Sequence, residues 1–105
     1  MSWGTLFFVA DETPVRPEFT APLPSQWAAR KEAARLVKRM AAQYRQPRLE
    51  LLADDLRTGK AKDDTVFFGA IVVAVLDYGE DPQAAVMAWL EDWAAQAGTH
   101  ADWTQ

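Results

Sequence analysis

The sequence predicts an all-α fold in which about four helices pack around a central apolar helix, residues 66–76, behind an extended N-terminal arm rich in proline. Two observations support this prediction: a long amphipathic segment follows Ser25, and residues typical of helix starts and stops bracket the later segments. With 105 residues, the chain is long enough for one domain with its own core. A small α+β fold is the alternative, and it requires residues 5–9 and part of 66–76 to pair as strands.

The N-terminal part of the chain is predicted to be extended. Residues 5–9 read TLFFV, which is a weak signal for a short strand. Residues 11–24 contain four of the six prolines, which exclude a helix or a central strand there. We therefore expect a single domain over residues 1–105 with an arm over 1–24, a helical core over 25–98 and a flexible tail over 99–105.

The first two helices have clear boundary signals. Ser25 is a typical N-cap for a helix over residues 26–46, and Pro47 ends it because the residue before a proline avoids helical geometry. Pro47 also suits the first position of a second helix, which is expected to run to Arg57 and to stop at Gly59. The apolar stripe of the first helix comprises Ala29, Ala33, Leu36, Val37, Met40 and Tyr44.

Two further helices are predicted in the C-terminal half. Residues 65–78 follow Asp63 and Asp64, which are suitable N-caps, and the middle of this segment is apolar on every side. Its β-branched composition favours a strand, but 11 to 14 residues is long for one, so we expect a buried central helix. Asp81 is the expected N-cap of the last helix, residues 82–97.

Charge is unevenly distributed along the chain. The 11 basic and 15 acidic residues give a net charge of −4, but the balance is −2 over residues 1–29, +6 over 30–62 and −8 over 63–105. The basic face expected on the first helix could attract a phosphate-bearing or acidic partner. Its candidate residues are Lys31, Arg35, Lys38, Arg39 and Arg45.

Five tryptophans in 105 residues is the most unusual feature of the composition. Trp89 and Trp93 lie one helical turn apart, and we expect them in the core. The candidates for a protein interface are the three that lie near segment ends: Trp3, Trp27 and Trp103.

The sequence has no residue suited to most kinds of catalytic chemistry. There is no cysteine, the one histidine (His100) lies in the expected tail, and the five scattered glycines form no phosphate-binding loop. The carboxylates match no standard metal-binding spacing. We therefore predict no catalytic residue, no metal and no cofactor, with a carboxylate-based enzyme as a third possibility behind the two binding functions.

The favoured function is a non-enzymatic protein-interaction module, such as an adaptor, assembly chaperone, inhibitor or regulatory subunit. It would act through exposed tryptophans and segregated charge on a protein partner, including a second copy of itself as a homodimer. The alternative is an accessory protein that binds nucleic acid through the basic face of the first helix. A further alternative is that the acidic C-terminal part imitates phosphates. No signal peptide or membrane span is expected, and the predicted location is the cytoplasm.

Overall fold

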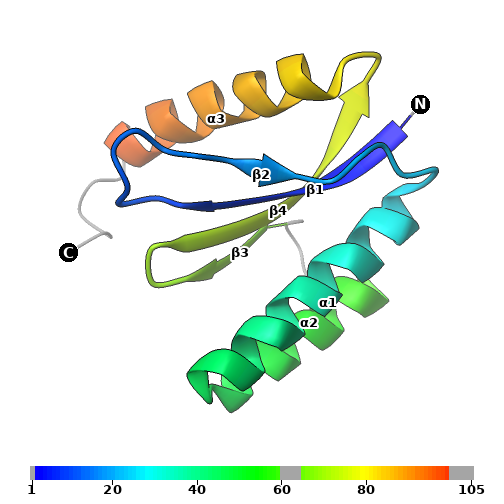
Figure 1. The fold of residues 1–105 in the computed structure, drawn as a ribbon, viewed down its shortest axis with the longest axis vertical. Coiled ribbons are helices and arrows are strands. Elements are labelled where there is room, and N and C mark those ends of the chain that lie inside the picture. The colour runs from blue at the N-terminus through cyan, green and yellow to red at the C-terminus, as the bar shows by residue number, and fades with distance from the viewer. Residues whose placement is uncertain (1, 60–64, 100–105) are drawn as a thin grey trace.

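The computed structural model describes residues 2–59 and 65–99, which form a small α+β fold rather than the predicted all-α helical bundle. Four antiparallel strands make one sheet in the order β2-β1-β4-β3, with helices on both of its faces (Figure 1). The elements are, in chain order, β1 (Ser2–Val9), β2 (Glu18–Phe19), α1 (Gln26–Tyr44), α2 (Pro47–Thr58), β3 (Thr65–Phe68), β4 (Ile71–Gly79) and α3 (Pro82–Thr99).

The predicted central helix is wrong, because residues 65–79 form the β3–β4 hairpin instead. The two strands are joined by Gly69 and Ala70, and Gly69 has φ 58°, which suits the first position of a tight two-residue hairpin turn. Asp63 and Asp64, the predicted N-caps, lie outside the described residues. β4 is apolar on both sides because helices cover both faces of the sheet, and this pattern resembles that of a buried helix.

The predicted N-terminal arm also needs correction, since β1 lies in the middle of the sheet. β1 pairs with β4 from Ser2↔Gly79 to Val9↔Ile71, as the α+β alternative required. The proline-containing segment after it returns along the outer edge, where β2 pairs with Leu6 and Phe7 of β1. This edge strand is only two residues long, in keeping with the prolines around it.

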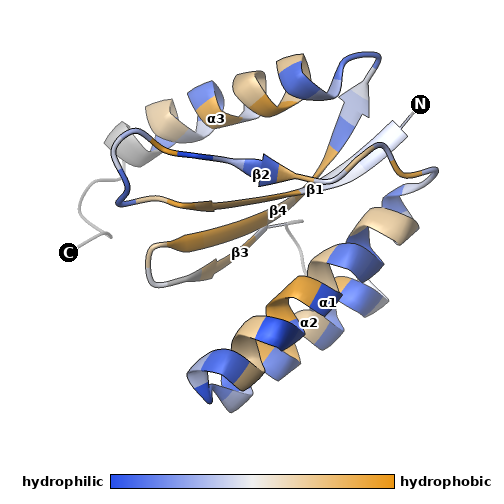
Figure 2. Ribbon diagram, in the orientation of Figure 1, coloured by the Kyte–Doolittle hydropathy of each residue, from blue (hydrophilic) through white to orange (hydrophobic). Residues whose placement is uncertain are grey.

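Side chains of β1 and β4 alternate between the two faces of the sheet, and each face has its own core. Figure 2 shows the hydrophobic stretches of these two strands between the helical layers. Phe7 and Val73 pack towards α1 and α2, whereas Phe8 and Val72 pack towards α3. The first core is completed by small and aliphatic residues of the helices, including Ala33. The sheet is therefore the middle layer of three.

The predicted boundaries of α1 and α2 are confirmed to within two residues. The Ser25 hydroxyl accepts a hydrogen bond from the Ala28 backbone N–H at 3.1 Å, and Pro47 is the first residue of α2. Gly59 ends α2 with φ 77°. The two helices run antiparallel and side by side over one face of the sheet (Figure 1).

The opposite face of the sheet is covered by α3 alone. Asp81 caps this helix as predicted, because its carboxylate accepts hydrogen bonds from the backbone N–H groups of Gln83 and Ala84. Trp89 and Trp93 pack edge-on against Phe8, with ring centroids 5.8 and 5.1 Å away, as expected for core residues. The helix runs to Thr99, two residues beyond its predicted end. The tail beyond it, with His100, lies outside the described residues.

Candidate functional site

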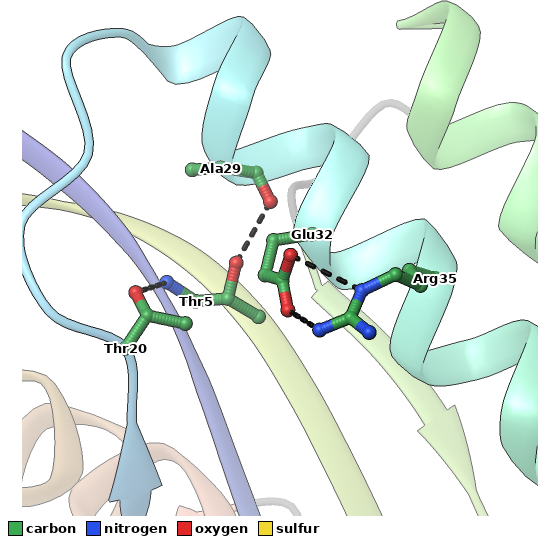
Figure 3. A network of polar contacts seen from close by, with 5 residues as sticks. All are labelled: Thr5, Thr20, Ala29, Glu32 and Arg35. Atoms are coloured by element: carbon green, nitrogen blue, oxygen red, sulfur yellow. Dashed lines mark hydrogen bonds and ion pairs between the residues drawn. The ribbon is translucent and has the colours of Figure 1, made fainter.

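The orientation of α1 is set by polar contacts with the sheet (Figure 3). The hydroxyl of Thr5, a buried residue of β1, donates a 2.7 Å hydrogen bond to the backbone carbonyl of Ala29 within α1. The Thr5 backbone N–H in turn donates to the Thr20 hydroxyl at 3.2 Å. Together with the burial of Ala33 and Val37, these contacts turn the opposite face of α1 towards solvent.

All five predicted basic residues lie on this solvent face. The exposed cations, which we call the basic surface, are Lys31, Arg35, Lys38, Arg39 and Arg45. The first four belong to α1 and Arg45 is its C-cap, so they follow one another along one side of a 19-residue helix. At a rise of about 1.5 Å per residue, Lys31 and Arg45 are about 21 Å apart along the axis.

Two members of the basic surface have carboxylate partners. Arg35 forms an ion pair with Glu32, and this hydrogen bond raises the pKa of the guanidinium, which therefore stays charged. Lys38 lies 3.9 Å from the carboxylate of Asp54 in α2, which also contacts Arg57 at 3.6 Å. Such exposed pairs are weak, so they leave these cations accessible to a phosphate.

Three members have no ion pair with any residue in the described part of the chain: Lys31, Arg39 and Arg45. Arg45 also has an unusual backbone, with φ 53° and ψ 47° in the left-handed region. Glycine or asparagine is the common residue at such a C-cap, and arginine there carries a conformational cost of about 1–2 kcal/mol. An arginine kept at this cost is consistent with a role for its side chain.

Sequence reasoning placed the basic site on one helix and missed Arg48, which is exposed on the first turn of α2. The short connection through Arg45 and Gln46 brings this residue to the end of the basic surface. Pro47 was the available signal, because a proline at the first position of a helix indicates a tight turn between two adjacent helices.

The two helical layers of the molecule carry net charges of opposite sign. The α1–α2 layer, residues 26–58, contains eight Lys or Arg against four Asp or Glu. From Asp77 at the end of β4 through α3 to Thr99 there are five acidic residues and no basic one. Because the sheet separates these layers, the charge segregation along the sequence becomes a dipole across the fold (Figure 1).

The three tryptophans predicted for an interface have different positions. Trp27, in the first turn of α1, is 52% exposed. Trp3 is half-buried, packs against the α1–α2 core and forms two backbone hydrogen bonds with Leu23, at 2.8 and 2.9 Å. Trp103 lies outside the described residues. Of the two described positions, Trp27 is the more accessible to a partner.

A hollow of about 170 Å³ lies between β1, β2 and α1, next to the Glu32–Arg35 pair (Figure 3). Phe7 and Leu36 form part of its apolar lining, and Glu18 and Glu32 provide carboxylates. This volume is well below that of an ordinary small-molecule site. Within residues 2–59 and 65–99, no three His, Cys, Asp or Glu residues are arranged to hold a metal ion. None of the three described helices is both long and apolar enough to cross a bilayer.

The chain matches no family model, no curated protein and no solved structure.

Proposed function

We propose that this protein is a non-enzymatic accessory protein that binds nucleic acid through the basic surface of α1. The observation that carries the proposal is the exposure of Lys31, Arg35, Lys38, Arg39 and Arg45 on one side of a helix that the sheet holds in place. Cations in such a row suit contacts with successive phosphates of a nucleic-acid backbone. A cytoplasmic location is part of this proposal.

The net charge of −4 is compatible with this function because the α1–α2 layer, with eight basic and four acidic residues, carries a net charge of +4, whereas the charged residues of α3 are acidic. The two charged residues of α3, Glu91 and Asp92, repel a polyanion, while the basic surface attracts it. A nucleic acid that approaches the molecule is therefore steered to one face. This arrangement favours a defined orientation of the complex over binding by the whole surface.

The test is fluorescence anisotropy with a labelled oligonucleotide at about 50 mM salt, where phosphate contacts are strong. Replacement of Lys31, Arg35 and Lys38 together by Gln is expected to weaken binding by at least about tenfold. It should also reduce the slope of log Kd against the logarithm of the salt concentration by roughly two, because each lost phosphate contact lowers this slope by about 0.7–0.9.

A control variant with the same net charge separates local contacts from overall charge. Ala84, Ala88 and Ala94 are exposed on α3, and replacing all three by Glu changes the net charge by −3, as the Gln variant does. We expect this control to bind nearly as well as the wild type. Equal binding by the wild type and the Gln variant, with circular dichroism showing both folded, would refute the proposed function.

A protein-interaction module remains the second candidate, and the outer side of α3 supports it. Met87 is 51% exposed there, and Ala84 and Ala88 are exposed beside it. An apolar interface at this helix would survive high salt, whereas phosphate contacts would not. A stoichiometric complex of purified protein and partner that persists at about 1 M salt, and is lost in Met87→Glu, would favour this candidate.

A further inference from the structure

One aromatic residue and several cations lie in a single line along α1. Trp27, Lys31 and Lys38 are four and seven residues apart, so successive members fall within about 40° of one another around the helix, and Arg45 follows as its C-cap. The line is about 27 Å long at 1.5 Å per residue. It begins with an exposed ring and continues with three positive charges.

Charged residues lie on both sides of the line. On the flank that faces β2, Arg35 and Arg39 lie between the line and Glu32, which pairs with Arg35 and lines the hollow beside β1. Asp54 of α2 lies on the other flank, 3.9 Å from Lys38. A duplex presents two phosphate backbones separated by a groove of about 6–12 Å, and a second backbone on the α2 flank would face Asp54. A single strand places one row of phosphates along the line.

The Trp27 ring is left uncovered by the end of α2. Gly59, the C-cap of α2, lies beside the ring, since a β-carbon built on that residue would lie 3.9 Å from the ring edge. Gly59 has φ 77°, a conformation that side-chain-bearing residues rarely adopt, so this C-cap supplies no side chain to cover the indole. An exposed indole beside phosphate-binding cations is a stacking platform for an unpaired base.

We infer that the basic surface takes single-stranded nucleic acid, with one base stacked on Trp27 and the phosphates of neighbouring nucleotides on Lys31, Lys38 and Arg45. This inference rests on the proposed function and specifies its substrate. At the stacked spacing of about 3.4 Å per nucleotide, a 27 Å line spans no more than about eight nucleotides. Sites of this size are typical of proteins that bind single strands without sequence preference.

The test compares three labelled probes of twelve units: oligo(dT), oligo(U) and a DNA duplex. Each is titrated with the wild type, Trp27→Ala, Trp27→Phe and the control Leu51→Ala, which removes an apolar side chain that is 68% exposed on α2. We expect both single strands to bind more tightly than the duplex. Trp27→Ala should weaken single-strand binding about tenfold, while Trp27→Phe, which keeps an aromatic face, and Leu51→Ala change it little.

A spectroscopic measurement reports the stacking directly. Subtracting the fluorescence spectrum of Trp27→Phe from that of the wild type gives the emission of Trp27, since the other four tryptophans are common to both proteins. We expect oligo(dT) to quench this difference and inorganic polyphosphate of equal charge to leave it unchanged. Polyphosphate provides the charges without a base, so it separates stacking from phosphate binding.

The outcomes distinguish this inference from the function beneath it. Tighter binding of the duplex, or unchanged single-strand binding by Trp27→Ala, would overturn the inference while the proposed function stands. Failure of all three probes to bind the folded wild type at about 50 mM salt would overturn both. If one single strand binds more tightly than the other, the preferred one identifies the nucleic acid as DNA or RNA, provided Trp27→Ala weakens it.

Discussion

The two faces of the sheet are stabilised in different ways. On one face, α1 and α2 pack through alanines and aliphatic side chains such as Val37 and Leu56, and their outer sides are basic. On the other, α3 packs through a cluster of Phe8, Trp89 and Trp93, and its charged residues are acidic. The comparison shows that one strand pair, β1 and β4, supports two helical layers that differ in charge and in the side chains through which they pack.

The largest effects are expected for truncations in the two cores, and they test whether each truncation loosens only the helices on its own face of the sheet. Phe8→Ala removes the ring that contacts both tryptophans of α3 and should lower the free energy of unfolding by about 3–5 kcal/mol. Leu56→Ala, on the other face, should lower it by about 2–5 kcal/mol. Hydrogen exchange measured by mass spectrometry should show that Phe8→Ala loosens α3 first and Leu56→Ala loosens α1 and α2. Equal loosening of all three helices in both variants would contradict independent layers.

The second prediction concerns Gly4, whose missing side chain leaves room for the ring of Tyr78. A β-carbon at Gly4 would overlap the ring of Tyr78, which lies at the irregularity in the β1–β4 register. Gly4→Ala should therefore lower the free energy of unfolding by about 1–3 kcal/mol, measured by urea denaturation. The double variant Gly4→Ala/Tyr78→Leu should lose less free energy of unfolding than the sum of the two single variants, because Tyr78→Leu removes the ring that a side chain at position 4 would meet. Additive costs would show that the two residues do not clash.

The third prediction uses the hydroxyl of Tyr78, which ties β4 to the segment beyond β2. It donates a 2.7 Å hydrogen bond to the Thr20 carbonyl, and Phe19 packs edge-on against the ring. Tyr78→Phe should lower the free energy of unfolding by about 1–2 kcal/mol, because it leaves that carbonyl without this donor. A change below about 0.3 kcal/mol would show that the bond contributes nothing.

The fourth prediction is that the stability of the fold depends on pH through Tyr78. Burial raises the pKa of Tyr78 above its ordinary value of 10.0, and the Thr20 hydroxyl offsets only part of this shift. The folded state therefore holds the phenol proton more tightly than the unfolded state does. Stability from this group is complete below about pH 10 and falls as the pH rises above that value. Thermal unfolding between pH 8 and 11 should show this fall in the wild type and a smaller one in Tyr78→Phe.

The smallest expected effect is that of replacing Arg45, which should stabilise the fold and weaken nucleic-acid binding. Arg45→Gly should raise the free energy of unfolding by up to about 1 kcal/mol, because glycine suits φ 53° better than arginine does. It should weaken oligonucleotide binding, because it removes one cation of the basic surface. Arg16→Ala removes an exposed charge from the segment between β1 and β2 without this conformational gain, so it serves as the matched control. A variant that gains stability and keeps full affinity would exclude a binding role for Arg45.

Local sequence signals were enough for the three helices, because their starts depend on neighbouring residues. Ser25, Pro47 and Asp81 act through hydrogen bonds or backbone geometry within a few residues of their own position. The separation of basic and acidic residues was likewise visible in the order of the chain, and the exposure of Lys31 followed from the helical pattern. The function was not determined at this level, since a solvated helix face and a binding face have the same pattern.

Whether residues 65–79 form a helix or two strands depends on contacts between distant parts of the chain. A segment that is apolar on every side suits a buried helix and equally a strand covered on both faces, so periodicity cannot separate them. The pairing of β4 with β1, some 70 residues away, satisfies the backbone groups of both strands and supplies a face for each helical layer. Only this tertiary arrangement places the net positive α1–α2 layer and the acidic α3 on opposite sides of the sheet.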